Sequence, residues 1–228
     1  MKIAIVCKFK TKKFRTILKK FNFDIVKKNP DFVLVHGGDG TILRSERAFP
    51  GIPKIVIKKG SSICRKCDYS EGHLKKILKK IVKGRYRVVE GSKLVVKARR
   101  KRLVGLNEIQ LHNKVPTRAV RFSIKTKNKN LGNLLGDGVI VSTPFGSTAY
   151  YSSTGGKPFK KGIGISFNNL HRKKIKSFVV PENSKIEIKV ERGPAQIIAD
   201  NYERYVNVDR GDRVLIEKVK EKARFVQI

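Results

Sequence analysis

The chain has 228 residues, 39% of them hydrophobic, which excludes a disordered chain and fits one large domain or two small ones. Its 53 Lys and Arg against 18 Asp and Glu give a net charge of +35, which favours anionic partners such as nucleotides, polyphosphate, nucleic acid or acidic lipid. Three cysteines are too few for a disulfide scaffold, and no apolar run reaches the roughly 18–20 residues of a membrane span or the about 7–15 of a signal-peptide core. We therefore predict a soluble, cytoplasmic protein with no membrane partner.

Residues 1–92 alternate between predicted strands and predicted helices. Short, continuous apolar runs are typical of strands buried on both faces of a parallel sheet, and this segment has three: Ile3–Val6, Phe32–Val35 and Ile55–Ile57. Apolar residues at helical spacing lie between the first two runs and again after the third, at Phe14–Phe21 and Leu74–Ile81. This order predicts an α/β domain with a Rossmann-like open sheet.

Residues 93–218 form a second predicted domain. Its elements are short strands separated by Gly, Asn, Asp and Pro, which is typical of an all-β, sandwich-like fold. The predicted strands are Leu94–Ala98, Leu103–His112, Val120–Lys125, Val139–Ser142, Ile186–Val190, Gln196–Ala199 and Val214–Glu217. One helical stretch, near Ser147–Ser153, interrupts them.

The sharpest motif is the glycine-rich segment Gly37–Thr41, which directly follows a predicted buried strand and precedes a helical segment. Glycines let a ligand approach the backbone closely, and the start of a helix presents N–H groups to anionic oxygens. An acid inside such a loop, Asp39, makes sense if it handles a proton, a metal or a sugar hydroxyl. The alternative is a tight turn in which Asp39 caps the helix.

Two further motifs lie in the β-rich domain. Asn107 and Glu108 offer one donor and several acceptors, which suits a ribose diol or an amide, although a polar pair at a strand edge is the simpler interpretation. Gly136–Gly138 is followed by a strand, a Pro/Gly turn and the hydroxyl-rich segment Gly146–Tyr150. There Ser147 or Thr148 caps a short helix, and Tyr150 either offers an aromatic face to a base or packs in the core.

These three segments, in this order, resemble the NAD kinase family, in its short archaeal form. The matching residues are Gly37–Thr41, Leu106–Ile109 and Asp137–Tyr150, with Val179–Ser184 as a later match. The resemblance implies two domains with the active site in the cleft between them, and a tail of about residues 219–228 that returns to the first domain. It also implies a homodimer or homotetramer.

The resemblance further implies a kinase that transfers a phosphoryl group from ATP, or polyphosphate, to the 2′-hydroxyl of the adenosine ribose of NAD, giving NADP. Mg²⁺, or another divalent metal, would be bound by the nucleotide phosphates, with no complete set of protein ligands. Asp39 is the implied catalytic base. The implied binding residues for phosphate, NAD and its adenosine are Gly38, Gly40, Thr41, Arg44, Asn107, Glu108, Arg118, Asp137, Thr148, Ala149, Tyr150 and Ser153.

The chain departs from the family pattern in the loop Gly60–Cys67, at Leu135, and at Asp200-Asn201-Tyr202. Because that loop borders the acceptor in the family, a related kinase with a lipid or nucleoside acceptor stays an alternative. Cys64 and Cys67 have the spacing of half a zinc site, but a structural zinc needs four ligands and the histidines show no matching spacing. His36, beside the glycine-rich segment, either contacts phosphate or is a packed histidine.

A second alternative is a nucleic-acid-binding protein driven by the charge of +35. Aromatic residues are only 8% of the chain, and it has no recognised nucleic-acid motif. We therefore expect nucleic acid to bind at most nonspecifically. A solvated basic surface is an equally good interpretation of most of the lysines.

Overall fold

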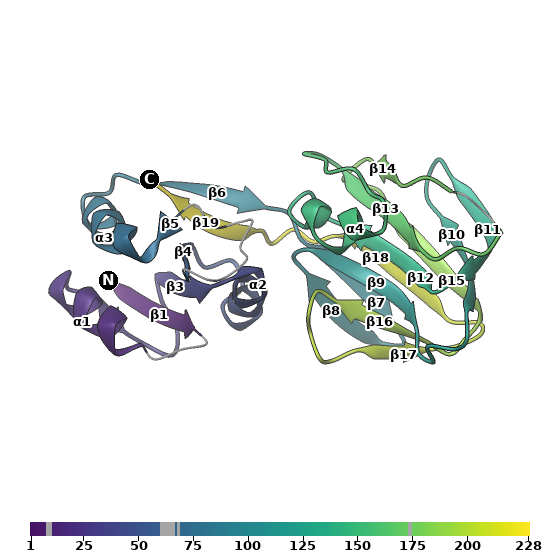
Figure 1. Cartoon of the computed structure of the whole chain (residues 1–228), viewed down its shortest axis with the longest axis horizontal. Helices are drawn as coiled ribbons and strands as arrows, with labels where there is room; N and C mark the ends of the chain where they lie inside the picture. Colours follow the sequence, from purple (N-terminus) through teal and green to yellow (C-terminus); the bar gives the residue numbers. More distant parts are fainter. Residues whose placement is uncertain (8–10, 60–66, 68, 173–174) are drawn as a thin grey trace. The chain divides into compact units, whose positions relative to one another are not determined.

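The computed structural model describes residues 1–7, 11–59, 67, 69–172 and 175–228. The chain divides into two compact units, one made of Met1–Gly91 with Glu221–Ile228 and the other of Ser92–Lys220 (Figure 1). The first combines helices with a sheet and the second is built from strands, so the predicted α/β layer with a β-rich domain is confirmed. No helix in the described ranges is long and apolar enough to cross a membrane.

A mixed sheet forms the centre of the first unit. Its described strands are β1 (Lys2–Cys7), β2 (Asp24–Ile25), β3 (Phe32–Gly37), β4 (Lys54–Lys58), β5 (Tyr69–Ser70), β6 (Arg87–Gly91) and β19 (Ala223–Gln227). They lie in the order β2-β1-β3-β4-β19-β6, with β5 beside β4. β1, β3 and β4 pair in parallel, as their continuous apolar runs predict. The end of the chain supplies β19, which pairs in parallel with β4 and antiparallel with β6.

Helices of the first unit follow the predicted apolar spacing. They are α1 (Lys12–Lys20), α2 (Asp39–Ala48), the short 3₁₀ helix η1 (Glu71–His73) and α3 (Leu74–Val82). α1 and α3 cover the same face of the sheet, because their apolar residues share one buried cluster with alternate strand residues. That cluster includes Phe14, Leu18, Leu74, Ile77, Leu78, Ile81, Ile3, Leu34, Ile55, Ile57 and Val226.

A buried ion pair fixes the far end of α2 to the sheet. Lys54 on β4 is fully buried, and its Nζ forms an ion pair with Glu46 of α2. The same Nζ donates hydrogen bonds of 2.8 Å to the carbonyl oxygens of Phe49 and Ile52. These bonds satisfy an ammonium that is fully buried, and they hold in place the helix whose first residue is Asp39.

Replacing Lys54 by Met is therefore expected to destabilise the protein by about 3 kcal/mol, because it leaves the Glu46 carboxylate buried without its cation. Equilibrium urea unfolding measures this change. The double variant Lys54→Met/Glu46→Leu is expected to recover most of the loss, since a well-packed apolar pair can replace a buried ion pair. Lys20→Met, at an exposed position on α1, is the matched control and is expected to change little. A loss for Lys54→Met no larger than for the control contradicts this assignment.

The second unit is a sandwich of two sheets, each with six strands in the described part of the chain. One sheet has the order β11-β10-β15-β18-β7-β8, from β7 (Leu94–Ala98), β8 (Lys101–Gly105), β10 (Val120–Lys125), β11 (Asn130–Gly136), β15 (Ile186–Arg192) and β18 (Arg213–Lys218). The other has the order β14-β13-β12-β9-β16-β17, from β9 (Glu108–Asn113), β12 (Gly138–Ser142), β13 (Ile163–Asn168), β14 (Phe178–Val180), β16 (Ala195–Ala199) and β17 (Val206–Val208). Apolar residues of both sheets share one core, so the predicted sandwich is confirmed.

Two local predictions for this unit are wrong. The predicted strand Leu103–His112 is two strands, β8 and β9, which Leu106 and Asn107 separate. The predicted helix is a 3₁₀ turn, η2 (Gly146–Thr148), followed by the four-residue α4 (Tyr150–Ser153), and neither Ser147 nor Thr148 caps it. The Ser147 hydroxyl instead donates to the Pro144 carbonyl oxygen at 2.8 Å.

Candidate active site

The glycine-rich segment joins β3 to α2 in the first unit. Gly37 ends β3, Gly38 is the N-cap residue of α2, and Asp39 is the first helical residue, so Asp39 is not the cap. A Cβ on Gly37 would lie 2.3 Å from the Thr41 hydroxyl oxygen, which only glycine avoids. The N-terminus of α2 follows directly from this tight turn and has N–H groups and the positive end of the helix dipole. At this N-terminus Gly38 and Asp39 are half-buried and Gly40 is exposed. This is the local geometry of a phosphate site.

In the second unit, one carboxylate fixes the segment that carries Asn107 and Glu108. Asp200 accepts hydrogen bonds from the backbone N–H groups of Leu106 at 2.8 Å, Asn107 at 2.7 Å and Glu108 at 3.1 Å. The Asp200 N–H in turn donates to the Glu108 carbonyl oxygen at 3.0 Å. Asp200 thereby satisfies the donors that the break between β8 and β9 leaves without sheet partners. In the sequence, Asp200 stands out only as part of a departure from the family pattern, which does not predict this role.

The two motifs of the second unit interlock. The Thr143 hydroxyl donates to the Leu106 carbonyl oxygen at 2.7 Å and accepts from the Gly146 N–H at 3.0 Å. The Thr143 N–H donates to the Asn107 carbonyl oxygen at 2.9 Å. A Cβ on Gly146 would lie 2.2 Å from that same oxygen, so the close approach requires glycine. Two segments about 35 positions apart in sequence, Leu106–Glu108 and Ser142–Gly146, are therefore held together as one surface, which we call the wall of the second unit.

Three of the predicted site residues, Glu108, Asp137 and Tyr150, lie near one another. Burial raises the pKa of Tyr150, and the negative charges of Asp137 and then Glu108 raise it further. Tyr150 is half-buried and its hydroxyl accepts a hydrogen bond of 3.0 Å from the Asn168 side chain. The tyrosine that packs in the core is its neighbour Tyr151, which is 1% exposed, so the interpretation of Tyr150 as a core residue is wrong.

Asparagines hold the Asp137 carboxylate. Its Oδ2 accepts from the Asn169 side chain at 2.7 Å and its Oδ1 from the Asn113 side chain at 3.4 Å. The Asn113 amide also donates to the Arg118 carbonyl oxygen at 3.3 Å, which ties the loop carrying the exposed Arg118 to this carboxylate. Sequence reasoning missed these asparagines and Asn168, because isolated asparagines in loops and at strand ends carry no signal of their own.

The remaining predicted residues lie on η2 and α4 of the second unit and on α2 of the first. Thr148 and Ala149 are partly exposed and Ser153 is exposed, all on η2 and α4 or between them, near Tyr150 in the chain. Arg44 is exposed on α2, in the first unit with Asp39. His36 is buried and packed against Phe14, with ring centroids 4.6 Å apart, which agrees with the packed-histidine interpretation.

Among the residues that the structure describes, no group of three His, Cys, Asp or Glu side chains could hold a metal ion. Cys64 and most of the departing loop lie outside the described residues, and only Cys67 of that loop is described.

Glu108 is an acid of this site with a strongly raised pKa. Burial, and then the negative charge of Asp200, raise the pKa of Glu108 to about 8, against a smaller lowering by the Gln110 side chain. Its Oε1 accepts from Gln110 at 3.4 Å, whereas its Oε2 is buried with no hydrogen-bond partner in the described structure. A buried, protonated acid with an unsatisfied oxygen is ready to form a hydrogen bond with a polar ligand.

Glu108 should make stability depend on pH. In the folded protein it keeps its proton up to about pH 8, whereas in the unfolded chain it ionises near 4.5. The folded state therefore binds more protons between these values, and its stability falls as pH rises through that window. Glu108→Gln removes this dependence, so its stability relative to the wild type is expected to rise by on the order of 4 kcal/mol from pH 4.5 to pH 9.

Urea unfolding at both pH values measures the difference between Glu108→Gln and the wild type. The exposed Glu203→Gln variant of the same unit is the control, and its difference from the wild type is expected to stay constant. A constant difference for Glu108→Gln as well shows that Glu108 ionises normally in the folded state.

The first unit has a glycine-lined helix start with an acid, and the second has a β-sandwich segment with buried polar groups; each is a feature of nucleotide-binding phosphotransferases. Residues 106–228 match the family model described as the ATP-NAD kinase C-terminal domain. The chain belongs to the NAD kinase family, which confirms the resemblance found in the sequence.

Relatives and solved structures agree with this assignment. The chain is 31% identical to the NAD kinase of Thermoplasma acidophilum over 92% of its own length and 78% of the relative, and 33% identical to that of Thermoplasma volcanium over 89% and 76%. An NAD kinase from Archaeoglobus fulgidus, solved in complex with ATP, is 27% identical with a TM-score of 0.86, covering 100% of this chain and 94% of that one. A yeast NADH kinase complexed with NADH shares the fold, with a TM-score of 0.90 at 16% identity, over 100% and 83% of the two chains.

Proposed function

We propose that this protein is an NAD kinase that transfers the terminal phosphoryl group of ATP to the 2′-hydroxyl of the adenosine ribose of NAD, giving NADP. The observation that carries the proposal is the match to NAD kinases along 92% of the chain. The same chain places an acid, Asp39, in the first turn of a helix that a glycine-rich segment precedes. An acceptor other than NAD, and a role in nucleic-acid binding, are not favoured by these relatives.

Asp39 is the proposed base of the reaction. The bond from the ribose 2′-oxygen to the terminal phosphorus forms while the bond from that phosphorus to the bridging oxygen of ATP breaks, and the hydroxyl proton passes to the Asp39 carboxylate. Because the transition state of phosphoryl transfer is loose, proton transfer comes late and positioning of the hydroxyl matters most. N–H groups at the start of α2, with Gly38, Gly40 and Thr41, and the side chain of Arg44 are proposed to stabilise the phosphate charge.

The second unit is proposed to hold the dinucleotide. The unsatisfied oxygen of Glu108 supports a hydrogen bond with the ligand, and Asn107 lies beside it on the segment that Asp200 fixes. Asp137 and Tyr150, which lie close to Glu108, offer an acceptor and an aromatic face for the adenosine or nicotinamide part. Thr148, Ala149 and Ser153 are proposed to contact the same ligand, and Arg118 to contact phosphate.

The donor is proposed to be ATP as its complex with Mg²⁺ or another divalent metal, with the ion carried by the phosphate oxygens as part of the substrate. An assembly of two or four copies and a cytoplasmic location are proposals that rest on the family resemblance alone.

A matrix of donors and acceptors tests the proposed function. ATP, GTP and polyphosphate are each combined with NAD, NADH, a nucleoside and a diacylglycerol, and the phosphorylated products are identified by mass spectrometry. We expect the fastest reaction with ATP and NAD, with NADP as the product. Phosphorylation of the lipid or nucleoside in preference to NAD, or no turnover with any pair, would overturn the proposal.

A further inference from the structure

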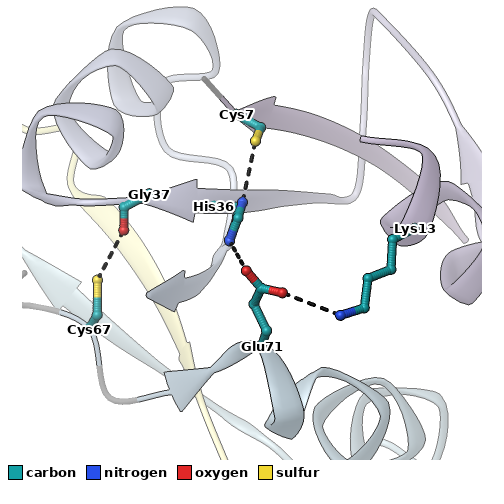
Figure 2. Close-up of polar contacts among 6 residues, drawn as sticks. All are labelled: Cys7, Lys13, His36, Gly37, Cys67 and Glu71. Atoms are coloured by element: carbon teal, nitrogen blue, oxygen red, sulfur yellow. Dashed lines mark hydrogen bonds and ion pairs between the residues drawn. The ribbon is translucent and has the colours of Figure 1, made fainter. Parts of the chain in front are cut away.

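A cluster of polar side chains outside the proposed site lies at the carboxyl ends of β1 and β3 (Figure 2). Cys7, the last residue of β1, is paired in register with His36 on the neighbouring strand. Its Sγ lies 3.3 Å from His36 Nδ1, and His36 Nε2 lies 2.8 Å from Glu71 Oε1. The other Glu71 oxygen is 3.4 Å from the Lys13 ammonium. A thiol, an imidazole and a carboxylate therefore stand in line.

The partners of His36 fix its tautomer. Burial raises the pKa of Glu71, but the hydrogen bonds and charges of His36 and Lys13 outweigh burial and keep this pKa below its ordinary value. Glu71 is then an ionised acceptor, so in the neutral form of His36 the imidazole proton sits on Nε2 and is donated to it. The lone pair on Nδ1 consequently faces the Cys7 thiol, which is the arrangement that activates a sulfur nucleophile.

Cys7 meets the conditions for reaction. It carries a thiol that is not in a disulfide, it is partly exposed, and the buried ring of His36 cannot turn away because it is packed on Phe14. Thiol reactivity follows a neighbouring base or cation together with access to reagents, and both are present here.

The cluster is directly connected to the glycine-rich segment. His36 precedes Gly37 in the chain, and the Cys67 Sγ lies 3.7 Å from the Gly37 carbonyl oxygen on the other side (Figure 2). An oxygen atom or a larger adduct on Cys7 would lie against the His36 ring, because the Cys7 Sγ is 3.3 Å from His36 Nδ1. Only Gly37 separates His36 from Gly38 in the chain, so a displaced His36 would act directly on the backbone that carries Gly38 and Asp39.

We propose that Cys7 is a modification site for peroxides and other soft electrophiles, activated by His36 and Glu71, and that its modification slows phosphoryl transfer. The second half of this proposal rests on the proposed function, whereas the reactivity of Cys7 does not.

The oxidation step balances with peroxide as the oxidant. The Cys7 proton passes to His36 Nδ1, and the thiolate attacks one peroxide oxygen. An S–O bond forms as the O–O bond breaks, and the leaving hydroxide takes the proton from His36 to become water. The sulfur is oxidised by two electrons to a sulfenic acid, which added thiol reduces back through a mixed disulfide.

Reactivity is tested on the full-length protein with iodoacetamide at neutral pH. The rate of carbamidomethylation at Cys7 is followed by mass spectrometry of its own peptide. We expect Cys7 to react at least about tenfold faster in the folded wild type than in the urea-unfolded chain, and Glu71→Gln to remove most of this advantage. Glu90→Gln, an exposed acid of the same unit, is the matched control and should leave the rate unchanged. A folded rate no higher than the unfolded rate, or equal rates in the wild type and Glu71→Gln, overturns the activation.

A second measurement tests the effect on activity. After treatment with hydrogen peroxide, the wild type is expected to form NADP at least about fivefold more slowly, with dimedone trapping at Cys7 and recovery in dithiothreitol. Cys7→Ser should keep its rate under the same treatment. Equal inhibition of Cys7→Ser overturns the regulatory half of the proposal. An untreated wild type that makes no NADP contradicts the proposed function, while the iodoacetamide rates still decide the reactivity of Cys7.

Discussion

Asp39→Asn is expected to lower kcat for NADP formation by about 10²- to 10⁴-fold, because an amide keeps the shape of the side chain and cannot accept the hydroxyl proton. The substitution is isosteric at the first position of α2, where Gly38 is the N-cap and provides no side-chain bond. The fold and the binding of ATP and NAD should therefore change little. Initial rates of NADP formation and isothermal calorimetry with each nucleotide measure the two effects separately.

The matched control for Asp39→Asn is Asp24→Asn, at an exposed position on β2 of the same unit. It removes the same charge from the first unit without touching the glycine-rich segment. Near wild-type turnover for both variants would show that Asp39 is not the base. Loss of turnover together with loss of ATP binding would instead assign Asp39 to the nucleotide site rather than to proton transfer.

Much of the first unit could be predicted from the sequence, because its strands are buried on both faces and read as continuous apolar runs. The placement of the glycine-rich segment between β3 and α2 followed from the same reasoning. The pairing of β19 with β4 and β6 had no comparable basis, because a five-residue segment at the end of the chain carries no pattern that identifies its neighbours.

The second unit has features that the hydrophobic pattern of the sequence does not predict. The run Leu103–His112 has apolar residues on both sides of Leu106 and Asn107, so the hydrophobic pattern marks neither the end of β8 nor the start of β9. The break depends on Asp200, more than 90 residues away in the chain, which accepts the N–H groups that a continuous strand would have given to the sheet. β11 has mostly exposed or half-buried positions, and β13 includes Gly164 and Ser166, so neither matches a strong strand pattern.

Asp200→Ala is expected to destabilise the second unit by about 4 to 6 kcal/mol, since each of the three hydrogen bonds to this carboxylate is worth about 1.5–3 kcal/mol and its loss leaves a buried N–H group without a partner. The affinity for NAD should fall at least about tenfold, because Asn107 and Glu108 lose the group that holds their backbone. Asp200→Asn keeps one side-chain acceptor oxygen and should fall between Asp200→Ala and the wild type in both measurements.

Urea unfolding followed by circular dichroism, and calorimetric titration with NAD, separate a positioning role for Asp200 from a merely structural one. The matched control is Asp209→Ala: Asp209 is exposed and accepts a single backbone hydrogen bond of 2.8 Å from Arg210, so its loss should cost less than about 1 kcal/mol. If Asp200 positions the dinucleotide site, Asp200→Asn should weaken NAD binding while ATP binding stays at its wild-type value, because the ATP-binding residues proposed for the glycine-rich segment are held by the first unit. A stability loss with unchanged NAD affinity would show that Asp200 has a structural role only. The segment that it holds would then not be part of the NAD-binding surface.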